Sequence, residues 1–270
     1  MNTVLKPCLL ILHKLIKLYP NSRALKVLYS RFSPSIKSDH FARSYGVVEL
    51  LAYLGKLDTN QPLTEEYIVS RFRSKASQYD SIVEKAGYLE HELELCSEST
   101  FSIADSLCKK PVYILDIGCG TGLLARRLFQ KGIAASIDGI DLSPEMLQEA
   151  HKRNIYSNLF SANAISHLTE SSKLYDIIAA CSVVPFFPPV QLESLIKAAK
   201  SSISHGGSLV FTFDVCAEDY RVNKKLFCEH STKLVRGIAQ KYFSDVRIET
   251  IHMSRIEAGE VVSGAICICS

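Results

Sequence analysis

Residues 112–122 read VYILDIGCGTG, an apolar run that ends in an aspartate and three glycines at alternate positions. The apolar run has the length and composition of a buried strand, and the helix-forming segment LLARRLFQKG follows it. Parallel α/β sheets bind ligands at such turns, at the carboxyl ends of their strands. We expect Gly118 and Gly120 to let a ligand approach the backbone, and Gly122 to let the helix begin close by. The stretch therefore predicts an α/β fold with a ligand loop after its first strand.

The chain after residue 112 alternates between strand and helix patterns. Seven strands are expected, at 112–117, 135–141, 156–161, 175–182, 207–214, 245–251 and 261–269. Helices are expected between them at 122–131, 144–153, 190–204 and 223–243. This alternation predicts parallel pairing with right-handed crossovers, but MSRIEAGE between the last two strands is too short for a crossover. The predicted fold is α/β: a seven-stranded, mostly parallel sheet with a terminal antiparallel hairpin.

The first part of the chain has a different pattern, with short helices broken by YPNS and SPS. We predict a helical extension over 1–62, resembling a degenerate helical repeat, and a second domain over 63–270 that begins with helices at 64–108. Residues 1–38 contain seven Lys or Arg and no Asp or Glu. They could form a partner-docking unit, a membrane-surface helix, a cleaved targeting segment or a solvated face packed on the second domain.

The composition narrows the class of protein. With 270 residues and 47% hydrophobic content, the chain can bury a sizeable core, and its net charge of +3 says little about partners. The nine cysteines show no C-x-x-C spacing, so we expect buried thiols in a reducing compartment and no metal site. The apolar run CLLIL is far too short to span a membrane. We therefore predict a cytoplasmic location and no transmembrane segment.

The glycine loop and a second carboxylate point to a particular ligand. No Lys-Ser/Thr follows the loop, and Leu123 occupies the third glycine position of G-x-G-x-x-G, so neither phosphate-binding motif matches. Asp141 ends the second strand, where a carboxylate can accept hydrogen bonds from both hydroxyls of an adenosine ribose. Asp116, directly before the loop, suits a positively charged amino group better than a pyrophosphate. This arrangement favours S-adenosylmethionine over NAD.

Four segments in order resemble the successive motifs of class I S-adenosylmethionine-dependent methyltransferases: ILDIGCGTGLLARRL, GIDLSPEML, YDIIAACSVVPFF and HGGSLVFTFD. The resemblance covers roughly residues 68–269 and implies their Rossmann-like fold. It implies that the glycine loop wraps the methionine end, that Asp141 holds the ribose, and that Asn163 accepts from the adenine amino group where many members carry Asp. The full set of cofactor contacts expected is Tyr79, Asp116, Gly118, Cys119, Gly120, Asp141, Leu142, Met146, Asn163, Ala164 and Cys181.

Two further resemblances concern the helical segments. RFRSKASQYDSIV looks like the helix that several methyltransferase families fold over the cofactor, which implies that Tyr79 reaches the methionyl carboxylate. The alternative is a core aromatic at helical spacing. CEHSTKLVRGIAQKYF and RIETIHMSRIEAGEVVSGAICI resemble the end of predicted methyltransferases with N-terminal tetratricopeptide-type helices. For residues 1–38, that architecture favours a helical docking unit rather than a transit peptide and implies a possible protein partner for the N-terminal helices.

The acceptor is less well defined than the donor. His230, which we expect at the rim of the sheet, is the candidate general base, with a helix-capping or packing role as the alternative. Phe186 and Phe187 could line an acceptor pocket, and core packing is the alternative. No basic stripe interleaved with aromatics indicates a nucleic acid. We predict O- or C-methylation of a small-molecule or carrier-bound acceptor; the alternative is a cofactor-binding scaffold or sensor that recruits a partner through its N-terminal helices.

Overall fold

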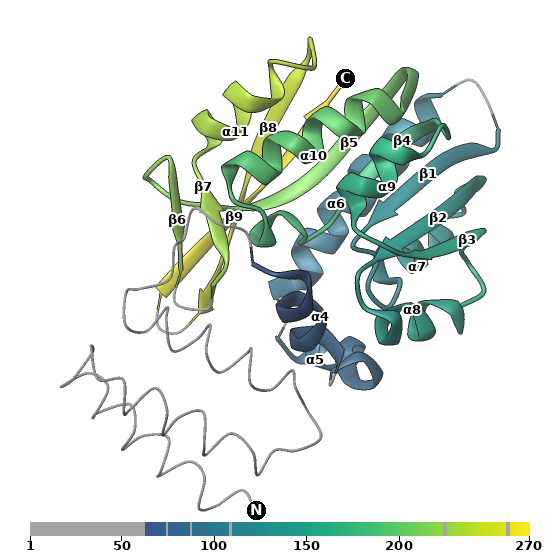
Figure 1. The fold of residues 1–270 in the computed structure, drawn as a ribbon, viewed down its shortest axis with the longest axis horizontal. Helices are drawn as coiled ribbons and strands as arrows, with labels where there is room; N and C mark the ends of the chain where they lie inside the picture. The colour runs from purple at the N-terminus through teal and green to yellow at the C-terminus, as the bar shows by residue number, and fades with distance from the viewer. Residues whose placement is uncertain (1–62, 74, 87, 108–109, 224–225, 258–259) are drawn as a thin grey trace, which may run out of the picture. The chain divides into compact units, whose positions relative to one another are not determined.

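The computed structural model describes residues 63–270 except 74, 87, 108–109, 224–225 and 258–259. The helical extension predicted for residues 1–62 lies outside the described residues. Within them, the structure confirms an α/β fold with a mostly parallel sheet and antiparallel strands at its end (Figure 1). The strands are β1 (Val112–Ile117), β2 (Ala135–Asp141), β3 (Asn158–Ser161), β4 (Tyr175–Ala180), β5 (Ile203–Val215), β6 (Tyr220–Val222), β7 (Cys228–His230), β8 (Val246–Glu257) and β9 (Glu260–Cys269).

The order of the strands follows from their pairing. Strands β3, β2, β1, β4 and β5 lie side by side in parallel, and β9 pairs antiparallel with both β5 and β8. The short β8–β9 connection thus forms the antiparallel hairpin that the sequence predicted. The chain places β2 and β3 on one side of β1, and β4 and β5 on the other. Open α/β sheets bind ligands at such a switch in strand order, outside the carboxyl ends of the strands.

Helices cover both faces of the sheet, because its strands are apolar on both sides. Buried side chains of α9, α10 and α11 pack with Leu115, Ile178 and Phe211 on one face. Those of α6 and α7 pack with Ile114, Ile177 and Val210 on the other, and Figure 1 shows α10 in front of the sheet and α6 behind it. The helices are α4 (Glu65–Arg73), α5 (Tyr79–Ala86), α6 (Tyr88–Ser106), α7 (Leu123–Gln130), α8 (Pro144–His151), α9 (Ala164–Glu170), α10 (Pro189–Ser202) and α11 (Thr232–Ala239), with short 3-10 helices η2 (Ala76–Gln78) and η3 (Val184–Phe186).

The prediction of one long helix at 223–243 was wrong. Among the residues that the structure describes there, only Thr232–Ala239 is helical, and Tyr220–Val222 pairs with Cys228–His230 as the β6–β7 hairpin. A local turn separates these strands: the Asn223 side chain accepts the backbone N–H of Phe227 at 3.1 Å, and Leu226 has φ of 65°. Ser231 then starts α11, because its hydroxyl accepts the N–H of Leu234 at 3.0 Å. The hairpin raises the number of strands in the described residues from the seven expected to nine.

Candidate active site

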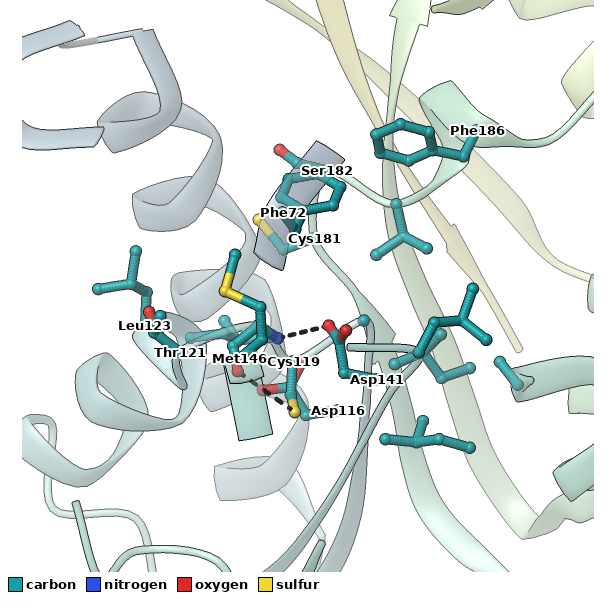
Figure 2. Close-up of a pocket in the computed structure, with 18 of the residues that line it drawn as sticks. Phe72, Asp116, Cys119, Thr121, Leu123, Asp141, Met146, Cys181, Ser182 and Phe186 are labelled. Atoms are coloured by element: carbon teal, nitrogen blue, oxygen red, sulfur yellow. Dashed lines mark hydrogen bonds between the residues drawn. The ribbon is translucent and has the colours of Figure 1, made fainter. Parts of the chain in front are cut away.

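A pocket lies at the carboxyl ends of β1, β2 and β4, against helices α4, α5 and α6 (Figure 2). Its lining is mostly apolar with a few polar groups, as is usual for small-molecule sites. Every residue that the sequence predicted to contact the cofactor lines it: Tyr79, Asp116, Gly118, Cys119, Gly120, Asp141, Leu142, Met146, Asn163, Ala164 and Cys181. Residues scattered over more than one hundred positions of the chain therefore meet at one site.

The glycines of the loop are needed for two different reasons. Gly118 and Gly120 have φ of 61° and 53°, in the left-handed region that side chains disfavour. A Cβ on Gly118 would lie 2.4 Å from Cγ2 of Val183, so packing inside the protein requires a glycine here as well as at the pocket surface. A Cβ on Gly120 would meet nothing nearer than the Gly118 carbonyl oxygen at 3.9 Å. The open space that a ligand needs therefore lies beside Gly120.

Asp141 at the end of β2 is held by backbone donors. Its Oδ2 accepts the N–H of Gly120 at 2.9 Å, and its Oδ1 accepts the N–H of Ser143 at 2.8 Å. Burial raises the pKa of this carboxyl, and the backbone hydrogen bonds oppose that rise. Each carboxylate oxygen has two lone pairs. The backbone of Leu142 also bonds this carboxyl, so Asp141 fixes the glycine loop and retains only part of its acceptor capacity for a ligand.

Asp116 at the end of β1 is nearly inaccessible, with 2% of its surface exposed. The hydroxyl of Tyr156 donates to its Oδ2 at 2.7 Å. Burial, with a smaller contribution from the charge of Asp141, raises the pKa of Asp116 to about 7 despite that hydrogen bond. A buried carboxyl that ionises near neutrality strongly favours a positively charged ligand group, because such a group would offset the cost of burying its charge.

Asn163 lines the pocket, but its side chain is used differently from the prediction. Its amide oxygen accepts the N–H groups of Ile165 at 2.9 Å and Ser166 at 3.2 Å, which caps helix α9. Its amide nitrogen donates to Glu65 Oε1 of α4 at 2.9 Å. Both lone pairs of the oxygen are therefore occupied, and the adenine contact expected of Asn163 has no free acceptor in this arrangement.

His230 does not reach the pocket. The sequence placed it at the rim as a candidate base, but it ends β7 with a fully buried side chain and is absent from the pocket wall. Its Nε2 lies 3.0 Å from the carbonyl oxygen of Phe187, and its ring lies 5.3 Å from that of Tyr220. Burial lowers the pKa of His230 to about 4. A base must contact the proton that it removes, so this geometry corrects the catalytic assignment and supports the packing alternative.

Part of the wall that covers the pocket was not predicted from the sequence. Ile68 and Phe72 of α4, Val83 of α5, and Leu89 and Leu93 of α6 contribute apolar side chains. Phe72 makes edge contacts with Tyr79 at 6.0 Å and with Phe186 at 5.6 Å between ring centres. Helical apolar spacing in 64–108 was visible, but spacing alone does not say whether a face meets a core or a cavity.

Polar bonds hold these covering helices over the loop. Asp80 of α5 accepts the Thr121 hydroxyl at 2.6 Å and pairs with Arg153. Arg73 of α4 pairs with Glu145 of α8 at 2.7 Å.

In the part of the chain that the structure describes, no helix is long and apolar enough to cross a membrane.

Comparisons with known proteins agree with this geometry. Residues 114–207 match the sequence model of the family described as Methyltransferase domain. A malonyl-[acyl-carrier protein] O-methyltransferase of Halalkalibacterium halodurans is 33% identical over 147 residues, which cover 50% of this chain and 52% of the relative. A ubiquinone biosynthesis O-methyltransferase of Coxiella burnetii is 30% identical over 113 residues, covering 41% and 47%. The chain spans about half the length of the curated relatives it matches.

Solved structures share the fold at low sequence identity. A Leishmania major S-adenosylmethionine-dependent methyltransferase aligns with a TM-score of 0.58 at 15% identity, over 78% of this chain and 86% of the other. The magnesium protoporphyrin IX methyltransferase of Synechocystis PCC 6803, solved with bound S-adenosylhomocysteine, aligns with a TM-score of 0.56 at 17% identity, over 76% and 99%. Residues 114–207 are thus similar in sequence to methyltransferase domains, and the described residues share the fold of these two solved structures.

Proposed function

We propose that this protein is an S-adenosylmethionine-dependent methyltransferase that methylates a small-molecule or carrier-bound acceptor, on oxygen or carbon. The observation that carries the proposal is the pocket itself, because all eleven predicted cofactor contacts line it. The malonyl-[acyl-carrier protein] and ubiquinone biosynthesis O-methyltransferases that match parts of the chain support this acceptor class.

The residues present fit the proposed cofactor. Asp116 is buried, and the hydrogen bond on its Oδ2 comes from the neutral hydroxyl of Tyr156. A ligand ammonium group would supply the positive charge that offsets the cost of burying this carboxylate. Asp141 has acceptor positions left for ribose hydroxyls, and the space beside Gly120 admits a ligand close to the backbone. Leu142 and Met146 offer apolar surface to an adenine ring. When bound, S-adenosylmethionine supplies an electrophilic methyl group on a sulfonium.

The protein's own contribution would be alignment and exclusion of water. Apolar residues of α4, α5 and α6 close one side of the pocket, and the bonds of Asp80 and Arg73 hold these helices in place. Orientation of the acceptor in a water-poor site accounts for much of the rate gain in such displacements. Since His230 lies away from the wall, we assign it no part in proton removal.

We further propose that residues 1–62 form a helical domain of the tetratricopeptide type, that it recruits a protein partner, and that the protein is cytoplasmic. Residues 63–270, including the helices at 64–108, would form the catalytic domain. The resemblance of residues 228–243 and 247–268 to predicted methyltransferases with N-terminal tetratricopeptide-type helices supports the helical docking domain. Pull-down from cell extract with the full chain and with residues 63–270 tests it, since only the full chain should retain the partner.

Two measurements test the enzymatic proposal. Calorimetric titration should give micromolar binding of S-adenosylmethionine and S-adenosylhomocysteine, and much weaker binding of NAD. Incubation with methyl-labelled cofactor and an extract from cells that lack the protein should give a labelled product that the heat-inactivated protein does not form. Binding without any labelled product would favour the scaffold alternative, whereas failure to bind would reject both functions.

A further inference from the structure

Ser182 occupies an unusual position in the wall of the pocket. It follows Cys181 just beyond β4 (Figure 2), and its φ of 57° lies in the left-handed region that residues with a side chain rarely adopt. Its backbone N–H donates to Thr212 Oγ1 of β5 at 2.8 Å. Strained backbone of this kind is found mainly at functional sites, where the surrounding structure enforces it. The strain here fixes where the Ser182 hydroxyl points.

The Ser182 hydroxyl donates its proton to a carboxylate behind the wall. Its partner is Oε2 of Glu92 on α6, a side chain with only 7% of its surface exposed. A hydroxyl has one proton and two lone pairs. Because that proton is directed to Glu92, the Ser182 oxygen can offer only lone pairs to a molecule in the pocket. A ligand group that bonds it must therefore bring its own hydrogen, as O–H or N–H.

The surrounding wall adds a second requirement. The ring centres of Phe72 and Phe186 lie 5.6 Å apart in an edge contact, and the two rings form an aromatic side of the pocket. Among the lining residues that the structure describes, none is Lys, Arg or His, whereas Asp116 and Asp141 are acidic. An ionised carboxylate brings no hydrogen for the Ser182 oxygen and meets no cation among the described lining residues, so this wall disfavours it.

We propose that Ser182, oriented by Glu92, is the subsite that holds the methyl acceptor, and that it selects a neutral acceptor bearing a hydrogen-bond donor, with a hydroxyl as the best fit. This inference rests on the proposed methyltransferase function and narrows it, because a carboxylate acceptor is disfavoured. Ser182 contacts the acceptor, and Glu92 acts as a positioning residue. Methyl transfer forms the O–CH3 bond and breaks the S–CH3 bond of the sulfonium, and the hydroxyl proton moves to the Ser182 oxygen as the serine proton moves to Glu92. The product has no hydrogen left for Ser182 and is released more readily than the substrate is bound.

The test compares three small probes on protein saturated with S-adenosylhomocysteine. Phenol brings a donor, anisole is the same ring without it, and benzoate is the anionic analogue. Ligand-observed NMR titration should show phenol binding about tenfold more tightly than anisole, as expected for one hydrogen bond to a buried pair. Benzoate should bind more weakly than phenol. Equal affinity for phenol and anisole, tighter binding of benzoate, or no phenol binding at all would each overturn the subsite.

Variants separate recognition from folding. Ser182→Gly removes the hydroxyl and accepts a φ of 57° without strain, so the preference for phenol should disappear in a folded protein. Glu92→Gln can donate an amide hydrogen to Ser182 and turn the serine proton toward the pocket, so the preference for phenol should shrink as anisole binding improves. Glu98→Gln, at an exposed position of the same helix, is the matched control and should retain the wild-type preference. A preference that survives in Ser182→Gly would reject the proposal.

Titration of S-adenosylhomocysteine distinguishes the two levels of failure. If it does not bind the wild-type protein, the proposed methyltransferase function fails. If it binds all three variants within about twofold of wild type, cofactor binding is intact, since a twofold change is under 0.5 kcal/mol. If the preference for phenol over anisole then persists in Ser182→Gly, only the acceptor subsite fails.

Discussion

The two ends of the pocket are built in different ways. The proposed donor end is lined by Asp116, Gly118, Gly120 and Asp141, which lie within 26 consecutive residues and are held by backbone geometry. The proposed acceptor end combines Phe72 and Ser182 with Glu92 behind them, and these come from three distant parts of the chain. A compact motif therefore points to the proposed donor, whereas the side chains of the proposed acceptor subsite meet only after folding and have no local signature.

Substitution of Asp116 by Asn tests the donor end and should have the largest effect. Asparagine keeps an oxygen that can accept the Tyr156 hydroxyl bond and removes only the charge. If the carboxylate faces a ligand ammonium group, affinity for S-adenosylmethionine should fall about 100-fold, the usual loss when one partner of a buried charge pair is removed. Calorimetric titration measures it.

The control for Asp116→Asn is the thermal unfolding midpoint. It should not fall, because burial raises the pKa of Asp116 and the neutral amide avoids that cost. A variant with native stability and unchanged affinity for S-adenosylmethionine would remove Asp116 from the donor site.

Gly118→Ala should have the next largest effect, this time on stability. The added Cβ would lie 2.4 Å from Val183 Cγ2 and would adopt a φ of 61°. Strain and overpacking together are expected to lower the free energy of unfolding by about 2–3 kcal/mol, measured by urea denaturation. In the double variant with Val183→Ala, the loss of stability caused by overpacking should be relieved, and the loss caused by the positive φ should remain. No rescue by the second substitution would mean that Val183 is not what requires the glycine.

The fold was largely predictable because apolar periodicity is local. All seven expected strands are present, and the hairpin between β8 and β9 followed from the length of its connection. The error at 223–243 also has a local cause. The Asn223 turn and the positive φ of Leu226 interrupt a segment whose apolar spacing still looks helical.

The site was predictable to the extent that its residues belong to a motif. Asp141 and the glycines could be assigned from spacing, but Asn163 could not, because the same side chain that lines the pocket also caps α9 and binds Glu65. Ser182 and Glu92 are 90 positions apart and carry no pattern that links them. His230 was assigned to the rim because it follows the fifth expected strand in a segment predicted to be helical, whereas it ends a buried strand.

The affinity for S-adenosylmethionine should fall as the pH is lowered, because Asp116 at the proposed donor end becomes protonated. Asp116, with a pKa of about 7, is neutral below that pH and charged above it, next to Tyr156 and Asp141. A cationic ligand group binds the charged form, so affinity should fall about tenfold per pH unit as pH drops below 7. Titrations at pH 6, 7 and 8 check this, and Asp116→Asn should flatten the profile. A wild-type profile that is already flat would show that no cation faces Asp116.

The smallest change is expected for His230→Gln, measured as methyl transfer to the acceptor identified from extracts. A glutamine amide can replace the imidazole Nε2 as donor to the Phe187 carbonyl, so the wall at Phe187 should stay in place. Loss of a general base costs about 100-fold or more in turnover, whereas a change in packing behind the wall should cost less than about threefold. Cofactor affinity, measured in parallel, should equal that of wild type. A 100-fold fall in turnover with intact affinity would return His230 to the chemistry, and would mean that the β6–β7 hairpin opens during the reaction to bring a buried side chain to the acceptor.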